Sequence, residues 1–88
     1  MTSYVKDPDA VLDYQIDWSA WLDSDTITTS EWIVPDGIVK DSDSHTDTAA
    51  TIWLSGGTLN TTYLVTNRIT TAAGRTDDRT IRITVRDR

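Results

Sequence analysis

The sequence has no cysteine and no phenylalanine, only two prolines and a single glutamate. Without cysteine, the chain has no disulfide framework, no thiolate nucleophile and no cysteine-built zinc site. No uninterrupted apolar run exceeds three residues, far short of the roughly 20 that a membrane-spanning helix needs. Residues 1–9 carry charges and no apolar h-region, so we expect no secretory signal peptide and no membrane partner.

Helix-forming residues are also scarce, whereas sixteen threonines and seven serines are present among 88 residues. Threonine, valine, isoleucine and aromatic residues favour strands, and no window keeps a helical apolar period over three turns. A chain of this length has room for one domain, which hides only roughly 60–65% of the surface of the unfolded chain. The composition therefore predicts one small all-β domain.

Alternating apolar and polar residues place the strands along the chain. The expected strands are Val11–Trp18, Thr26–Val34 with a bulge near Thr29, Ile38–Lys40, Ala50–Leu54, Thr61–Ile69 and Arg79–Arg86. A single 3₁₀ turn is expected over residues 18–22. This spacing predicts a small immunoglobulin-like Greek-key β-sandwich of six or seven strands, with a small closed barrel as the alternative.

Residues 1–10 are expected to form an extended N-terminal arm, because Asp7-Pro8-Asp9 cannot continue a regular strand. The single sandwich domain would then span residues 11–88. An ordered arm would lie on a neighbouring subunit, with the aromatic Tyr4 as its candidate contact.

Charge is unevenly distributed along the chain. Residues 1–50 hold eleven acids and two bases, whereas residues 51–88 hold three acids and six bases, for a net charge of −6. A net acidic domain is a poor general ligand for nucleic acid, because phosphate contacts dominate that affinity. Arg82 and Arg86 fall on the same outward side of the last expected strand, where they form either a solvated strand face or a basic docking edge.

The polar residues do not form a recognisable chemical site. Asp41–Asp47 begins like a calcium-binding loop but lacks the glycine at its sixth position, and Ile52 stands where the loop needs glutamate. His45 and its neighbours Ser44 and Asp47 cannot form a catalytic triad by adjacency alone. Paired carboxylates on one strand would be too far apart for glycosidase chemistry. We therefore predict no catalytic residue, no metal and no cofactor.

The aromatic residues are divided between core and surface. Tyr14, Trp32 and Tyr63 are expected in the core, since the chain has few other large apolar groups. Trp53 is out of phase with its apolar neighbours, and Trp21 lies in an irregular turn. An exposed tryptophan can anchor a protein interface, pack at the edge of the sandwich, or stack on a sugar.

Two segments resemble immunoglobulin-like modules of the fibronectin type III kind. They are Trp32-Ile33-Val34-Pro35-Asp36-Gly37-Ile38 and Gly57-Thr58-Leu59-Asn60-Thr61-Thr62-Tyr63-Leu64-Val65. The resemblance implies a buried tryptophan at position 32. It also implies that the Tyr63 hydroxyl ties the chain at a corner.

Three further segments resemble small structural proteins of tailed bacteriophages and prophages, of the head–tail connector or fiber–tail adaptor kind. These segments are Lys6–Tyr14, Asp17–Leu22 and Thr66–Asp77. The resemblance implies a non-enzymatic adaptor in the virion, made in the host cytoplasm. It would be present in multiple copies and bound to portal or neck, tail or fiber proteins.

The sequence thus leads to two functional hypotheses. The first is an adaptor that docks to other virion proteins, with Tyr4, Trp21, Trp53, Arg82 and Arg86 as candidate interface residues. The alternative is a carbohydrate-binding or surface-adhesion module that uses exposed tryptophans.

Overall fold

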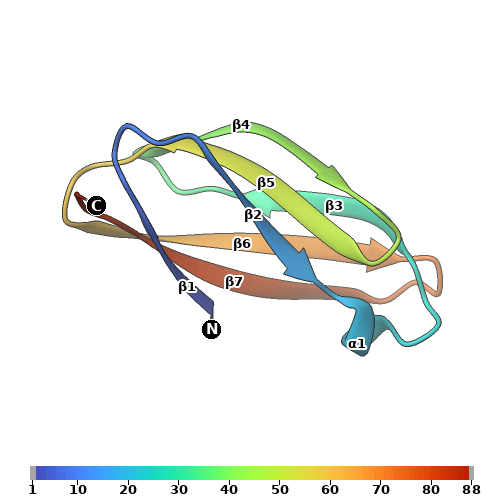
Figure 1. The fold of residues 1–88 in the computed structure, drawn as a ribbon. Helices are drawn as coiled ribbons and strands as arrows, with labels where there is room; N and C mark the ends of the chain where they lie inside the picture. Colours follow the sequence, from blue (N-terminus) through green and yellow to red (C-terminus); the bar gives the residue numbers. More distant parts are fainter. Residues whose placement is uncertain (1, 88) are drawn as a thin grey trace.

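The computed structural model describes residues 2–87, which form seven strands and one short helix in two stacked sheets (Figure 1). The elements are β1 (Thr2–Lys6), β2 (Leu12–Asp17), α1 (Ser19–Leu22), β3 (Ile27–Ile33), β4 (Ile38–His45), β5 (Ala49–Gly56), β6 (Thr61–Thr71) and β7 (Thr76–Val85). No helix among these residues is long and apolar enough to cross a membrane.

The strands form two sheets that pack face to face. Sheet A has the order β1-β7-β6-β3, and sheet B has the order β2-β5-β4. All pairings are antiparallel except that of β1 with β7, which is parallel. Consecutive strands often lie in different sheets, which is the Greek-key connectivity of immunoglobulin-like domains. The predicted β-sandwich is therefore confirmed.

The inward faces of the two sheets supply the hydrophobic core. Along β6 the buried residues alternate with exposed ones, as the period of a half-buried strand requires. The predicted core aromatics Tyr14, Trp32 and Tyr63 are all buried, each with no more than 7% of its surface exposed. Trp18 is the largest of the fully buried side chains.

The predicted corner at Tyr63 is present. The Tyr63 hydroxyl accepts a hydrogen bond of 2.8 Å from the backbone N–H of Thr58, in the β5–β6 connection. The backbone at Gly57 has φ +98°, and a Cβ there would lie 2.7 Å from a methyl carbon of Val85. Glycine is therefore required at this position both by the backbone conformation and by the space.

The N-terminal segment differs from the expected arm, because Thr2–Lys6 form β1 and pair with β7 from Ile81 to Val85. Strand β1 ends just before the Asp7-Pro8-Asp9 segment, as the proline predicts. The last residue of β1, Lys6, is fully buried. The Lys6 Nζ donates to the carbonyl oxygens of Asp7 (2.9 Å) and Gly56 (2.8 Å), so it ties sheet A to sheet B. Burial lowers the pKa of this lysine.

Other boundaries also differ from the expected ones. Residues 19–22 form a single α-helical turn instead of a 3₁₀ turn, with i to i−4 bonds from Leu22 to Trp18 and from Asp23 to Ser19. The register of β3 shifts between Ile27 and Thr29, slightly before the predicted bulge. Strands β4 and β7 are longer than expected, because pairing continues after the buried Ile38 in β4 and begins well before the buried Ile81 in β7.

Candidate docking surfaces

The outer face of sheet A, which we call face A, combines threonine pairs with one cross-strand pair of leucine and arginine. The threonine pairs join β6 to β7 through side-chain hydrogen bonds of 2.8 to 3.4 Å. Between two of these pairs, Leu64 stands opposite Arg82 in the register. Leu64 is 52% exposed, and Ile33 at the β3 edge of the same face is 43% exposed. Face A is thus a polar sheet face with an apolar centre beside a positive charge.

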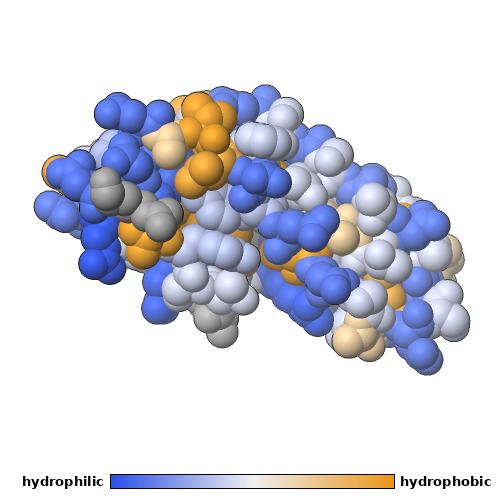
Figure 2. Space-filling model, in the orientation of Figure 1, coloured by the Kyte–Doolittle hydropathy of each residue, from blue (hydrophilic) through white to orange (hydrophobic). Residues whose placement is uncertain are grey.

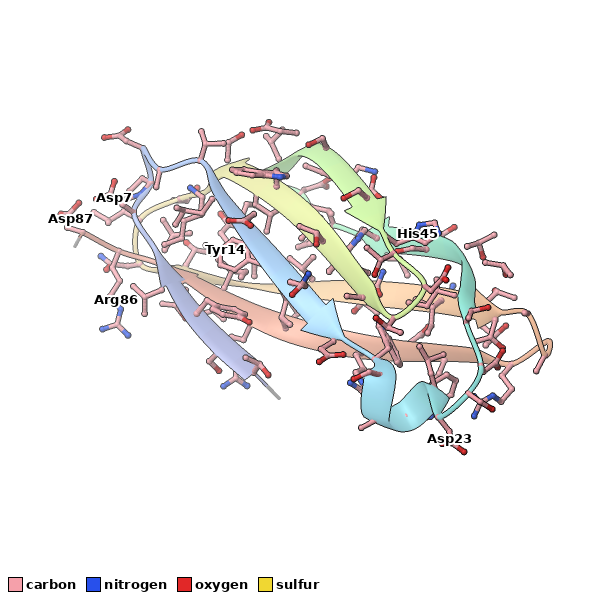
Figure 3. All side chains as sticks on the ribbon, turned by 45° about the vertical axis from the view of Figure 1, so that its right-hand side comes forward. Asp7, Tyr14, Asp23, His45, Arg86 and Asp87 are labelled. Carbon is pink, nitrogen blue, oxygen red and sulfur yellow. The ribbon has the colours of Figure 1, made fainter. Side chains whose placement is uncertain are left out.

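The two arginines of the predicted basic edge differ from the other cations that the structure describes. Arg82 and Arg86 are exposed, and among residues 2–87 their side chains have no hydrogen-bond or ion-pair partner. Arg68, in contrast, holds Asp78 at 2.8 Å and faces Glu31 at 3.9 Å. Figure 3 shows the Arg86 side chain pointing away from the ribbon, just beyond the end of β7. These two guanidinium groups remain available to an external partner.

The outer face of sheet B, which we call face B, has Trp53 at its centre. Trp53 lies on the middle strand β5, between Asp13 of β2 and Ser42 of β4, and is 42% exposed. Asp17 lies further along β2, and Asp41 lies beside Ser55, whose hydroxyl donates to it at 2.9 Å. The charged residues on this face are therefore carboxylates. The prediction that Trp53 points away from the core agrees with this placement.

Trp21 lies in a cluster of tryptophans and arginines at the α1 end of the sandwich. Its ring contacts Trp18 edge-on, with 5.4 Å between ring centroids, and the Arg75 guanidinium carbon lies 4.2 Å above it. Arg75 also binds Asp25 at 3.1 Å and donates to the carbonyl of Leu22 at 3.0 Å. Trp21 is half-buried, and these contacts hold α1 against the sandwich.

The carboxylate of Asp25 is part of the same cluster. Hydrogen bonds from the Thr71 hydroxyl, from the backbone N–H groups of Thr26 and Ala73 and from Arg75 lower the pKa of Asp25 to about 2. Asp25 is therefore ionised over the whole neutral range. Its role in this cluster is to fix the β6–β7 loop to α1.

A second arginine spans the seam between the two sheets. Arg79 of β7 donates to the backbone carbonyl of Asp17 at 3.0 Å, and its guanidinium carbon lies 4.3 Å from the Trp18 ring centroid. The Trp18 indole in turn donates to the buried side chain of Asn67 at 3.0 Å. Asn67 completes its hydrogen bonds with the Ser30 hydroxyl and the Glu31 carbonyl. This network joins the sheets without exposing a reactive group.

Tyr4 lies next to an open cleft between β1, β2 and β7, with a volume of about 550 Å³. Its ring packs against that of Tyr14, with 4.8 Å between centroids. The walls of the cleft also include Ile16, Asp17 and Arg79. Figure 2 shows hydrophobic side chains on this side of the molecule as small patches separated by hydrophilic ones. Tyr4 is therefore a half-buried wall residue.

The polar segment that resembles the start of a calcium loop is extended. Residues Asp41 to His45 lie in β4, where successive side chains point to opposite sides. Asp41 accepts a hydrogen bond from Ser55, and Asp43 pairs with Lys40 at 3.1 Å. Figure 3 shows His45 at the far end of this edge strand. Within residues 2–87, no three metal-ligating side chains are grouped closely enough to hold an ion.

The five predicted interface residues do not form one patch. Arg82 belongs to sheet A, Arg86 follows the end of β7, and Trp53 is on the opposite outer face of the sandwich. Tyr4 and Trp21 are half-buried and contact other aromatic residues. Sequence reasoning missed Leu64, which is more exposed than Trp53 and is the apolar neighbour of Arg82. Its position between outward-facing Thr62 and Thr66 was the signal that could have revealed it.

Comparison with protein families decides the affiliation of the chain. The family model described as podophage GP4 fiber-tail adaptor protein gp77 matches residues 6–84. The chain belongs to this family. The match of the gp77 family covers nearly the whole sandwich and includes all three segments that resemble phage structural proteins. A search of curated protein sequences found no match.

Among solved structures, the chain is similar to one described as the solution structure of the PKD domain from KIAA 1837 protein. The TM-score is 0.55 and the sequence identity is 18%, over 97% of this chain and 78% of the other. At this identity the likeness concerns the fold alone, and it supports the immunoglobulin-like architecture of this gp77-family member.

Proposed function

We propose that this chain is a non-enzymatic adaptor of a podophage particle that docks to other virion proteins through the outer faces of its sandwich. Membership of the fiber-tail adaptor family supports a structural role in the virion. The single observation that carries the docking mechanism is the state of Arg82 and Arg86. They are exposed and unpaired among the described residues, whereas Arg68 on the same sheet is paired with Asp78 and Glu31.

The proposed mechanism is electrostatic steering followed by contact of preformed surfaces. A network that ties α1, the β6–β7 loop and the two sheets together keeps the strands fixed, so docking costs little ordering of the domain. Charges that are exposed at the rim of an interface act mainly on the association rate and are screened by salt. The partners would be tail or fiber proteins, with several copies of the adaptor in each particle.

The test is incorporation into a reconstituted particle. The double variant Arg82→Glu and Arg86→Glu should fold normally and fail to be incorporated. The matched control is Arg82→Lys with Arg86→Lys, which keeps both positive charges and should be incorporated. Normal incorporation of the glutamate variant over a wide salt range would remove Arg82 and Arg86 from the docking mechanism.

The carbohydrate-binding alternative would use the exposed indole of Trp53 on face B. A glycan array separates the two hypotheses, because saturable binding that Trp53→Ala abolishes would favour a sugar-binding module. The adaptor hypothesis expects no such binding and expects co-sedimentation with tail proteins.

A further inference from the structure

The two outer faces of the sandwich carry matching cross-strand pairs of opposite charge. On face A, exposed Leu64 stands directly opposite Arg82 in the β6–β7 register. On face B, exposed Trp53 stands directly opposite Asp13 in the β2–β5 register. Directly paired positions on neighbouring strands lie roughly 4.5–5.5 Å apart. Each face therefore presents one large apolar side chain immediately beside one charge.

On each face, the unpaired charges around the cross-strand pair have the same sign as the charge in that pair. Asp17 and Asp41 also lie on face B, whereas Lys40, which is paired in the register with inward-facing Leu54, is held by Asp43 at 3.1 Å. On face A, Arg68 is paired with Asp78 and Glu31, and the charges without a partner among residues 2–87 are those of Arg82 and of Arg86, just beyond the end of β7. These five charges sum to +1. Neither Arg82 nor Asp13 has a side-chain partner within the described part of the chain. The unpaired charges are thus acidic on face B and basic on face A.

From this juxtaposition we infer that face B of one copy docks on face A of a second copy. Trp53 of one copy would pack on Leu64 of the next, and Asp13 would face Arg82. The contact uses two different patches, so it is heterologous: each copy keeps one free face A and one free face B. Such contacts build rings when the rotation closes and open filaments when it does not.

The dimensions of the domain set the strength of this contact. The principal extents are 41, 21 and 17 Å, so the broad faces measure about 41 by 21 Å. A standard protein interface buries about 800 Å² of surface on each partner, which is close to the area of one whole face. A contact centred on Trp53 and Leu64 covers less than that. We therefore expect weak association in dilute solution that depends on concentration and on salt.

This inference deepens the proposed docking function by naming a second copy of the chain as one partner. It does not require any other virion protein, so it can be tested with the purified chain. The measurement is the weight-average mass by sedimentation equilibrium over a concentration series, at low and at high salt. The expected result is a mass that rises beyond that of a dimer at low salt and returns toward the monomer at high salt.

The variants test the geometry of the contact. Arg82→Glu alone and Asp13→Arg alone should each abolish self-association, because each creates a like-charge contact. An equimolar mixture of these two variants should associate again, since the two introduced charges attract. Trp53→Thr should also give a monomer, and Thr suits the strand equally well. Asp36→Arg is the matched control: it changes the net charge as Asp13→Arg does but lies in the β3–β4 turn, so association should persist.

The outcomes separate this inference from the proposed function. A parent chain that stays monomeric at every concentration and salt level overturns the self-docking contact. So does association that persists in Arg82→Glu, Asp13→Arg and Trp53→Thr alike. If the isolated chain is monomeric and the Arg82 and Arg86 reversal still blocks incorporation into the particle, the adaptor function stands and only the self-docking contact fails.

Discussion

The corner at Tyr63 allows a quantitative test of what one hydroxyl contributes to the fold. Tyr63→Phe removes the oxygen that accepts the Thr58 N–H at 2.8 Å and leaves the buried ring in place. A typical intramolecular hydrogen bond contributes roughly 0.5–1.5 kcal/mol to stability. Thr58 is an exposed residue, so water replaces part of the lost bond. We therefore expect a loss of about 1 kcal/mol.

In a domain of this size, 1 kcal/mol corresponds to a fall in Tm of about 4–8 °C. Urea unfolding should show a lower midpoint with an unchanged slope, because the exposed surface of the unfolded chain is the same. Tyr63→Ala, which also removes the ring, should cost about 3–5 kcal/mol. That loss is large against the roughly 5–15 kcal/mol of a normal domain.

The matched control is Tyr4→Phe, which deletes the same atom from a half-buried tyrosine whose hydroxyl has no hydrogen-bond partner among residues 2–87. Its stability should stay within about 0.5 kcal/mol of the parent. If Tyr63→Phe and Tyr4→Phe melt at the same temperature, the corner hydrogen bond does not stabilise the fold and this reasoning is wrong.

Three further predictions concern single residues. Gly57→Ala should lower the Tm far more than Gly74→Ala. Both glycines have positive φ, but only at Gly57 would a Cβ lie 2.7 Å from Val85. Equal losses of Tm would refute the steric argument. Asn67→Leu should cost about 1–3 kcal/mol in urea unfolding by leaving the Trp18 indole N–H without its acceptor, and an unchanged midpoint would contradict this. Because the pKa of Asp25 is lowered from 3.8 to about 2 in the folded chain, the ionised carboxylate contributes its full stability above pH 3.8 and loses it as the pH falls toward about 2. The variant Asp25→Asn should therefore show a Tm that depends less on pH in this acid range than that of the parent.

The sequence predicts the fold best where a strand has one buried and one solvated face. In β2, β6 and the second half of β7, burial alternates in the period that the sequence shows, so those strands are recognised with small errors at their ends. The core positions of Tyr14, Trp32 and Tyr63 follow from the same pattern and the resemblance to fibronectin type III modules. Local periodicity is sufficient there because both sheets pack on a single core.

Periodicity fails where the sheet pairing is not accompanied by burial. Strand β4 has a single buried residue, Ile38, and the rest is an edge stabilised by backbone bonds to β5. Strand β1 ends on a buried lysine, and one of its two carbonyl acceptors, that of Gly56, is 50 residues away in the sequence. The contacts of Arg75 and Arg79 with Trp21 and Trp18 join positions more than fifty residues apart, and no local pattern encodes them.

The parallel pairing of β1 with β7 has a mechanical consequence. Thr2 lies beside Ile81, and Lys6 lies beside Val85. The N-terminal end of β1 and the C-terminal end of β7 therefore lie at opposite ends of the strand pair. A force that pulls the two chain ends apart therefore acts along both strands in opposite directions. It loads all the hydrogen bonds of the pair at once in shear, whereas a hairpin pulled from its open end would separate one bond at a time. The pairing of β1 with β7 therefore resists tension applied through the ends of these two strands.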